Sequence, residues 1–235
     1  MRIFLCGDTH GDYDTRKLNS KHFIEGKDLT KDDYVIICGD ACLTWNDKFD
    51  PYIQKWYNEK PWTTLFVDGN HENFDRLYSY PVVDFHGGKA HQLSSSIFHL
   101  MRGEIFDFNN QKFFVMGGAH SVDKMYRKEG TSWWPQEVPT QEEFNHGLDN
   151  LEKVNYHIDY VLSHEVSNTI IDGWHYDHDE ITCYFEVIDA MCKPKIHFAG
   201  HHHIDAKINE TLIMYHNVYE LLTDGTLRFV NDDKL

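Results

Sequence analysis

The stretch of residues 2–11, RIFLCGDTHG, contains a short apolar run that stops at Gly7 and is followed by Asp8 and His10. The run predicts a buried β-strand, and the carboxylate and imidazole just beyond it can hold one metal ion. Four later stretches repeat this arrangement of an apolar strand and a candidate ligand: YVIICGD (34–40), TLFVDGNHE (64–72), YVLSHE (160–165) and IHFAGHHH (196–203). Open α/β sheets place binding sites beyond the carboxyl ends of their strands, so we expect the five strand ends to meet at one patch.

The length and composition are typical of a folded globular protein. With 235 residues, the chain is long enough for one large domain or two small ones. Hydrophobic residues make up 41% and aromatic residues 14% of the chain, which is enough for a core and argues against disorder. Because the candidate ligands run from Asp8 to His203, one site would use both ends of the chain. We therefore expect residues 1–235 to form a single domain.

The formal net charge of −16 limits the partners of the protein. Such an excess of carboxylates repels long polyanions, so we expect no binding to long nucleic acids. A small phosphorylated substrate is still compatible with this charge, because two divalent metal ions would bring about four positive charges into the site.

The cysteines and the apolar runs predict a soluble cytoplasmic protein. The cysteine count is odd and includes no CxxC pair, which is typical of reduced thiols. The cysteines are Cys6, Cys38, Cys42, Cys183 and Cys192. A metal-binding role for Cys38 and Cys42 is the alternative to the favoured interpretation of buried, hydrophobe-like side chains. The apolar run before Gly7 is too short for a signal peptide, and no stretch reaches the roughly 18 apolar residues that a membrane-spanning helix needs.

The order of predicted elements indicates an α/β fold. The predicted strands lie at residues 2–6, 34–38, 64–67, 97–101, 105–108, 112–116, 159–163 and 196–199. The predicted helices are a weak one at residues 15–24 and clearer ones at 49–59, from Thr140 onward and at 181–191. The first third has the βαβ rhythm of a parallel sheet, whereas Asn109-Asn110 suits a tight hairpin in an antiparallel or mixed second sheet. Residues 117–139 show no clear period, and so long an irregular stretch is typical of a functional insertion.

The candidate ligands combine carboxylate, amide and imidazole groups without thiolate. They are Asp8, His10, Asp40, Asn70, His164, His201 and His203. This donor set favours Mn²⁺, Fe or Zn²⁺ over Mg²⁺ and Ca²⁺, which prefer oxygen ligands alone. Seven ligands are too many for one ion, but with one shared carboxylate they make two four-ligand sites. Two metals about 3.5–4 Å apart can activate a bridging water and clamp a phosphoryl group for displacement.

The motifs GDTHG, GD, GNHE, a lone histidine and GHxH, in this order, resemble those of the calcineurin-like metallophosphoesterases, and the resemblance extends from Asp8 to His203. It implies a four-layer αββα sandwich with two mixed β-sheets and a site at one edge. It also implies two divalent cations, with Mn²⁺ preferred and Fe or Zn²⁺ as alternatives. The ligands that it implies are Asp8, His10 and His203 for the first metal, Asn70, His164 and His201 for the second, and Asp40 as the bridge. His71 would act as general acid or stabilise charge on the phosphoryl group.

The sequence departs from the protein-phosphatase branch of this family at the second motif. That branch reads GDxVDRG, whereas this chain reads GDACLTW, so the phosphate-binding arginine is missing. The carboxylate that orients His71 must come from elsewhere, and Asp75 is the candidate by proximity. The candidates for replacement phosphate contacts are the cationic residues Arg102, Lys124 and Arg127. Trp133 and Trp134 either stack on a substrate or fill a gap between layers, and we leave these two alternatives open.

A second group of metal-ligating residue types follows no predicted strand. It comprises His175, Asp177, His178, Asp179 and Glu180. The favoured interpretation is a solvated loop in which Asp179 caps the next helix, and a place on the substrate rim is the alternative. His202 alternates away from its neighbours and is expected in a supporting or surface position. His86-Gly87 is expected to form a turn.

The leading functional hypothesis is a dinuclear metal-dependent phosphoesterase. It would hydrolyse a phosphate mono- or diester through a metal-bridging hydroxide, on a small nucleotide-like or phosphoprotein substrate. The alternative is a catalytically inactive metal-binding scaffold with the same fold. All seven ligand positions and His71 are present, which favours the enzyme. A nuclease that acts on long DNA would need a basic path, and none is visible.

Overall fold

The N-terminal apolar run forms strand β1 (Ile3–Cys6), which is buried along its whole length. Its side chains alternate: Ile3 and Leu5 belong to the core between two β-sheets, whereas Phe4 and Cys6 belong to the core beneath the helices. Both faces of the strand are therefore covered by protein, which explains why the run lacks polar alternation. The structure, a computed structural model, describes residues 1–230.

The first sheet has eight strands and is mixed. Its order is β14-β13-β1-β2-β3-β6-β5-β4. The central strands β1, β2 (Tyr34–Cys38), β3 (Thr63–Val67) and β6 (Ile97–Leu100) are parallel. The flanking strands pair antiparallel: β4 (Val82–Phe85) and β5 (Gly88–Ser94) on one side, β13 (Tyr219–Leu221) and β14 (Leu227–Phe229) on the other.

The second sheet has six strands in the order β11-β12-β10-β9-β8-β7 and is also mixed. Strands β8 (Gln111–Met116), β9 (Tyr160–Ser163), β10 (Ile196–Ala199) and β12 (Thr211–Ile213) are parallel. Strands β7 (Ile105–Phe108) and β11 (Ala206–Ile208) pair antiparallel at the edges. As predicted, Asn109 and Asn110 turn the β7–β8 hairpin, with φ of 57° and 61°.

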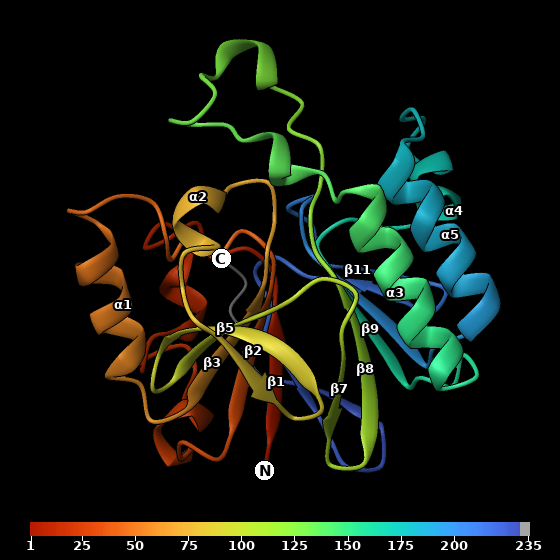
Figure 1. Cartoon of the computed structure of the whole chain (residues 1–235). Coiled ribbons are helices and arrows are strands. Elements are labelled where there is room, and N and C mark those ends of the chain that lie inside the picture. Colours follow the sequence, from red (N-terminus) through yellow and green to blue (C-terminus); the bar gives the residue numbers. More distant parts are fainter. Residues whose placement is uncertain (231–235) are drawn as a thin grey trace.

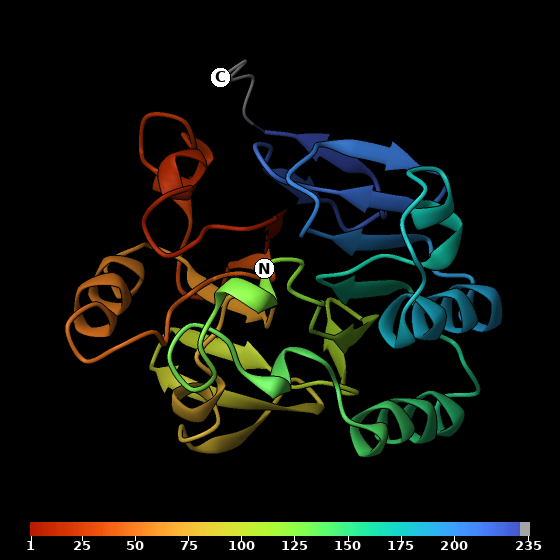
Figure 2. The ribbon, with the colours of Figure 1, turned by 90° about the horizontal axis from the view of Figure 1, so that it is seen from above.

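Helices cover the outer face of each sheet, so four layers result (Figures 1 and 2). Helices α1 (Asp50–Asn58) and α2 (Phe74–Leu77) pack on the first sheet. Helices α3 (Gln141–Lys153) and α5 (Glu180–Cys192) pack on the second, together with the short α4 (Asn168–Asp172). The predicted α/β class with two mixed sheets is confirmed.

Several local predictions were wrong or incomplete. The weak helix expected at residues 15–24 is replaced by two 3₁₀ helices, Thr15–Leu18 and Glu25–Asp28. The β4–β5 hairpin was not expected, because Val82 and Asp84 point toward solvent and leave no apolar run. The turn at His86-Gly87, which joins the two strands, was expected. Residues 117–139 are irregular as predicted, apart from 3₁₀ turns at Lys124–Tyr126 and Pro135–Glu137, and the segment projects beyond the sheets (green in Figure 1).

Candidate metal centre

The five strand ends singled out in the sequence come together at one edge of the two sheets. Strands β1, β2 and β3 of the first sheet and β9 and β10 of the second carry the candidate ligands just beyond their carboxyl ends. Three groups of side chains lie there, and within each group the donor atoms are within 4.8 Å of one another. The groups are Asp8, His10 and His203; His10, Asp40 and His71; and Asp8, Asp40 and His164. The structure thus joins side chains that are almost two hundred residues apart in the chain.

Asp40 lies between two subsets of these donors. Its Oδ2 atom is 3.3 Å from Nε2 of His10. His10 belongs to the subset with Asp8 and His203, in which Nε2 of His203 lies 3.1 Å from Oδ2 of Asp8. The Oδ1 atom of Asp40 is 3.3 Å from Nε2 of His164, which is also 3.2 Å from Oδ1 of Asn70. Asp40 therefore presents one oxygen to each subset.

His201 completes the set from the second sheet. Its ring centroid is 4.9 Å from that of His164, and its backbone N–H donates a hydrogen bond to Oδ1 of Asp8 at 3.1 Å. All seven predicted ligand residues therefore lie in one cluster.

The backbone of the cluster is held in an uncommon conformation. His10, Asp40, His201 and His203 all have positive φ, between 41° and 67°, which non-glycine residues rarely adopt. Such residues persist where the surrounding structure holds them, and they gather at functional sites. Gly39, with φ of 88°, lies so close to the His164 ring that a Cβ atom would collide with it. A glycine is therefore required before Asp40 for the two sheets to approach.

Hydrogen bonds orient the imidazole rings toward the centre of the cluster. Nδ1 of His10 bonds Asp14 at 2.7 Å, and Nδ1 of His164 bonds the carbonyl oxygen of Cys38 at 2.9 Å. In both rings Nε2 is left to face Asp40. Glu165 pairs with His202 at 2.7 Å and with His201 at 3.4 Å, so His202 has a supporting position, as expected. Second contacts of this kind fix the tautomer of a metal-binding histidine.

Sequence reasoning missed the supporting residues Asp14, Glu165 and Lys17. The ammonium group of Lys17 donates a hydrogen bond to the carbonyl oxygen of Asp8 at 2.6 Å and thereby fixes the loop after β1. The four-residue spacing of His10 and Asp14, and the position of Glu165 beside His164, were signals that could have identified two of them.

The electrostatics of the cluster fit divalent cations. Asp8 and Asp40 are buried, and burial acts to raise the pKa of both carboxyls, but the nearby imidazoles outweigh it and lower both. Burial conversely acts to lower the pKa of His164, yet Asp40 and Asp8 raise it to about 10. Oδ2 of Asp8 is buried and accepts no hydrogen bond of good geometry within residues 1–230. Two buried carboxylates, surrounded by nitrogen and oxygen donors, form a candidate site for metal ions.

A cavity of about 940 Å³ opens over the cluster. His71 lines it, and its backbone N–H donates to Oδ1 of Asp40 at 2.8 Å. The guanidinium of Arg127 also lines it, with its terminal nitrogens 3.0 and 3.2 Å from the His71 ring nitrogens and Nε 2.7 Å from Asp123. Burial lowers the pKa of His71, the Asp40 charge opposes this shift, and Arg127 adds to it. At neutral pH this ring is therefore largely unprotonated.

The model of the calcineurin-like phosphoesterase family matches residues 1–205. This chain belongs to that family. No curated protein sequence matches it. One similar solved structure is described as GAP50, the anchor in the inner membrane complex of Plasmodium, at 12% identity and a TM-score of 0.55, over 100% of this chain and 85% of that one. At that identity the likeness shows the fold alone.

A second solved structure, the sulfate thiohydrolase SoxB of Thermus thermophilus, matches this chain at a TM-score of 0.45 and 12% identity. The match covers 98% of this chain and 56% of SoxB. None of the helices within residues 1–230 has the length and apolar composition needed to cross a bilayer.

Three polar residues singled out in the sequence do not line the cavity. Arg102 is buried, bonds Asp68 through Nε at 2.9 Å and Glu143 at 3.2 Å, and does not line the cavity, so it is not free to hold phosphate. Asp75 accepts a hydrogen bond from Nε1 of Trp134 at 2.9 Å, not from His71. Lys124 lies over the Trp133 ring, 4.0 Å from its centroid, outside the cavity lining. Only Arg127 of the three expected cations reaches the cluster.

The loop before α5 corrects another expectation. Asp179 does cap α5, and its Oδ1 accepts hydrogen bonds from the backbone of Ile181 and Thr182, both at 2.8 Å. However, residues 176–180 also line the cavity, so the segment forms part of its rim and is not simply a solvated loop. Of the two tryptophans, Trp134 is buried and packs edge-on against Trp45, which favours the gap-filling alternative.

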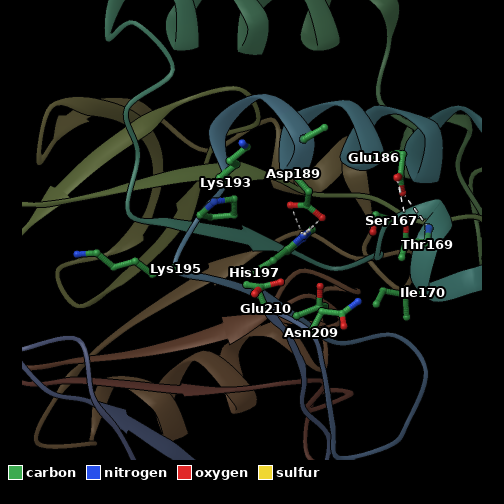
Figure 3. A pocket seen from close by; sticks show the side chains of 13 residues that line it. Ser167, Thr169, Ile170, Glu186, Asp189, Lys193, Lys195, His197, Asn209 and Glu210 are labelled. Carbon is green, nitrogen blue, oxygen red and sulfur yellow. Dashed lines mark hydrogen bonds and ion pairs between the residues drawn. The ribbon is translucent and has the colours of Figure 1, made fainter.

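A second cavity, of about 740 Å³, lies between α5 and the β11–β12 turn (Figure 3). Several of its polar groups already pair with one another. Asp189 pairs with His197 at 3.0 Å, and Glu186 accepts hydrogen bonds from Thr169 at 2.8 and 2.9 Å. His197 in turn contacts the hydroxyl of Ser163 at 2.7 Å, but that serine is fully buried and has no access to a substrate. We assign this cavity no role in the chemistry.

Proposed function

We propose that this calcineurin-like phosphoesterase hydrolyses a phosphate mono- or diester at a dinuclear centre of divalent cations, with Mn²⁺ preferred and Fe or Zn²⁺ as alternatives. The observation that carries the proposal is the position of Asp40, with one carboxylate oxygen toward each of two donor subsets. A carboxylate in that position suits two cations close together, which is the arrangement used for in-line displacement at phosphorus.

The donor subsets divide the candidate ligands between two ions. We assign Asp8, His10 and His203 to the first ion, Asn70, His164 and His201 to the second, and Asp40 to both. When bound, the cations would supply Lewis-acid polarisation of the phosphoryl group and an activated water nucleophile. The chain itself contributes the fixed geometry: the rings are held by Asp14, Cys38 and Glu165, so little reorganisation is needed when the substrate arrives.

We assign phosphate binding to Arg127 and transition-state contact to His71. The two terminal nitrogens of Arg127 present N–H donors beside the cluster, and Asp123 fixes the orientation of the guanidinium. Paired N–H donors match the oxygens of a phosphoryl group. Because the pKa of His71 is lowered, its ring would donate a proton to the leaving alkoxide mainly in acidic solution and would accept hydrogen bonds at neutral pH.

The volume of the cavity, about 940 Å³, suits a small phosphorylated substrate, and we expect no membrane and no long nucleic acid as partner. The cysteines are all free, which is consistent with our expectation of a cytoplasmic protein. The alternative function, a metal-binding scaffold, is favoured by one finding: the solved structure with the TM-score of 0.55 is described as an anchor. Fold alone does not decide between these functions.

The deciding experiment compares hydrolysis of p-nitrophenyl phosphate with that of bis(p-nitrophenyl) phosphate by the Mn²⁺-loaded protein. Asp40→Asn and His71→Ala serve as controls, and bound metal is measured by mass spectrometry. We expect about two metal equivalents and turnover of at least one ester, reduced in both variants. Bound metal without turnover of either ester would support the scaffold, and a protein that never binds a second equivalent would refute the dinuclear proposal.

A further inference from the structure

One part of the cavity wall, made of residues outside the metal cluster, is acidic. Tyr176, Asp177, Asp179 and Glu180 line it, and they come from the loop that precedes α5 and from the first residue of that helix. Among the residues of the described chain that line the cavity, Arg127 is the one lysine or arginine, and it lies beside His71. The cavity therefore has a cationic donor beside His71 and carboxylates that belong to neither donor subset.

Within residues 1–230, no lysine or arginine pairs with these carboxylates. Asp177 is exposed and forms no hydrogen bond or ion pair within residues 1–230. Glu180 faces a single partner, Nε2 of His120, at 3.3 Å. Asp179 uses Oδ1 to cap α5, and one of its oxygens lies within 4.8 Å of donor atoms of His120 and Glu180. The partial charge of about +0.5 at the helix N-terminus offsets less than one of these three negative charges.

Arg127 cannot neutralise this wall. Its Nε atom is 2.7 Å from Asp123, and its other two nitrogens face His71. A substrate whose phosphoryl group occupies the cluster would share the rest of the cavity with this unbalanced negative charge. The negative charge would repel further phosphate groups and attract a positive charge.

We infer that the substrate is a phosphate ester whose alcohol carries a positive charge, such as an amino alcohol or a quaternary ammonium alcohol. Asp177 and Glu180 attract the charge, and the ring of Tyr176, 62% exposed at the same wall, offers a face for cation–π contact. This inference rests on the proposed hydrolase and adds its substrate class. A nucleoside di- or triphosphate, by contrast, would place extra negative charge against these carboxylates.

The test uses pairs of esters that differ in charge but hardly in shape. Trimethylammonioalkyl phosphates with two, four or six carbons in the spacer are compared with tert-butylalkyl phosphates of equal length. In the second series the alcohol part carries no charge. The same alcohols are also supplied as 4-nitrophenyl diesters, so that both ester classes are covered. We expect the charged member to be preferred by about tenfold in kcat/KM for at least one spacer. The preference should shrink at high salt, because exposed charges are screened.

Two double variants separate the wall from the general charge of the protein. Asp177→Asn with Glu180→Gln removes two negative charges from the cavity and should bring the preference close to one. Glu142→Gln with Asp149→Asn removes two exposed charges on α3, outside the cavity lining, and should leave the preference in place.

Each outcome decides the inference. Equal or reversed kcat/KM for all pairs, with normal hydrolysis of p-nitrophenyl esters, would overturn it and leave the proposed function intact. Loss of a metal equivalent in the cavity double variant would overturn it by assigning the wall to a metal ion held with His120. No hydrolysis of any ester, p-nitrophenyl esters included, would instead refute the proposed function, and the inference with it.

Discussion

Asp40 is the single residue on which both donor subsets depend, because it presents one oxygen to His10 and the other to His164. Asp40→Asn keeps the shape but removes the charge that would be shared by two cations. We expect the variant to lose at least one metal equivalent and to lose about 100-fold or more in kcat. Asp32→Asn, at an exposed position outside the site, is the control for both measurements. Full metal content and activity in Asp40→Asn would contradict the assignment.

His71 makes the activity depend on pH in a direction that the structure determines. Burial lowers its pKa below the ordinary value near 6.5. If the protonated ring assists the leaving group, kcat falls as the pH rises through this lowered pKa. We expect this fall in kcat with phenyl phosphate, whose leaving group needs a proton, and a smaller fall with p-nitrophenyl phosphate. His71→Asn should remove this fall in kcat, and an unchanged pH profile in that variant would exclude His71 as the acid.

Arg127 is the cation that we assign to phosphate binding. Arg127→Ala removes two N–H donors beside the cluster, so kcat/KM should fall about 10- to 100-fold while the metal content stays unchanged. Because the Arg127 charge lowers the pKa of His71, removal of this charge should also move the fall in kcat that depends on His71 to higher pH. Lys124→Ala, whose ammonium lies over Trp133, is the matched control. Unaltered kinetics in the Arg127→Ala variant would contradict the assignment of Arg127 to phosphate binding.

The sequence identified the seven candidate ligands because each follows a strand that is apolar on both faces, and strand ends of parallel neighbours share an edge. The positions of Asp75 and Arg102 were not predictable in this way. Asp75 is only four residues from His71, but the start of α2 turns its carboxylate toward Trp134. Arg102 is buried because Asp68, on a neighbouring strand end, needs a counter-charge there. Such pairings depend on packing and leave no local pattern.

At the scale of elements, a buried polar chain joins the ends of β3 and β6 to α3. Asp68 bonds His99 at 2.9 Å and Arg102 through Nε at 2.9 Å, and Arg102 reaches Glu143 of α3. Asp68→Asn leaves the buried guanidinium without its main partner. We expect a loss of about 3–5 kcal/mol in the free energy of unfolding, which corresponds to a fall of about 10 °C in Tm. Asp84→Asn, at an exposed surface pair, should change little.

The same chain predicts how stability responds to acid. The Asp68 carboxyl is fully buried, which acts to raise its pKa, but Arg102 and His99 lower it well below the usual value. The stabilisation is therefore complete above the ordinary carboxyl pKa near 3.9 and is lost as the pH falls toward the lowered one. Acid unfolding of Asp68→Asn should show a shallower pH dependence in that range. An identical slope in both proteins would contradict this account.

The predictability of elements follows their burial. Strands β1, β2, β3, β9 and β10 were predicted because they are mostly apolar and buried along their whole length. The capping box of Thr140 and Glu143 marked the start of α3, and both of its hydrogen bonds are present. The edge strands β4 and β11 were missed, since their half-exposed residues form no apolar run. Helix α4, of five residues, is too short to show a helical period.

At the scale of the whole molecule, the candidate metal centre joins the two sheets. Its donors come from β1–β3 of one sheet and from β9 and β10 of the other. Binding to the folded state alone should stabilise the protein by about 2.7 kcal/mol at a metal concentration of 100 times Kd, or about 5–10 °C in Tm. Differential scanning calorimetry with Mn²⁺ and with a chelator measures this shift. His164→Ala should reduce it, and a Tm that is insensitive to the chelator would contradict the proposed centre.

The order of the donors along the chain also has a consequence for biosynthesis. Asp8 and Asp40 emerge from the ribosome long before His164, His201 and His203 are made, and the acidic residues lie at an incomplete site until then. Metal uptake by the proposed centre would therefore come at the end of folding, after β9 and β10 have joined the second sheet. A nascent chain that stalls before these strands would lack three of the seven candidate ligands, His164, His201 and His203, so a loaded centre would require synthesis past His203.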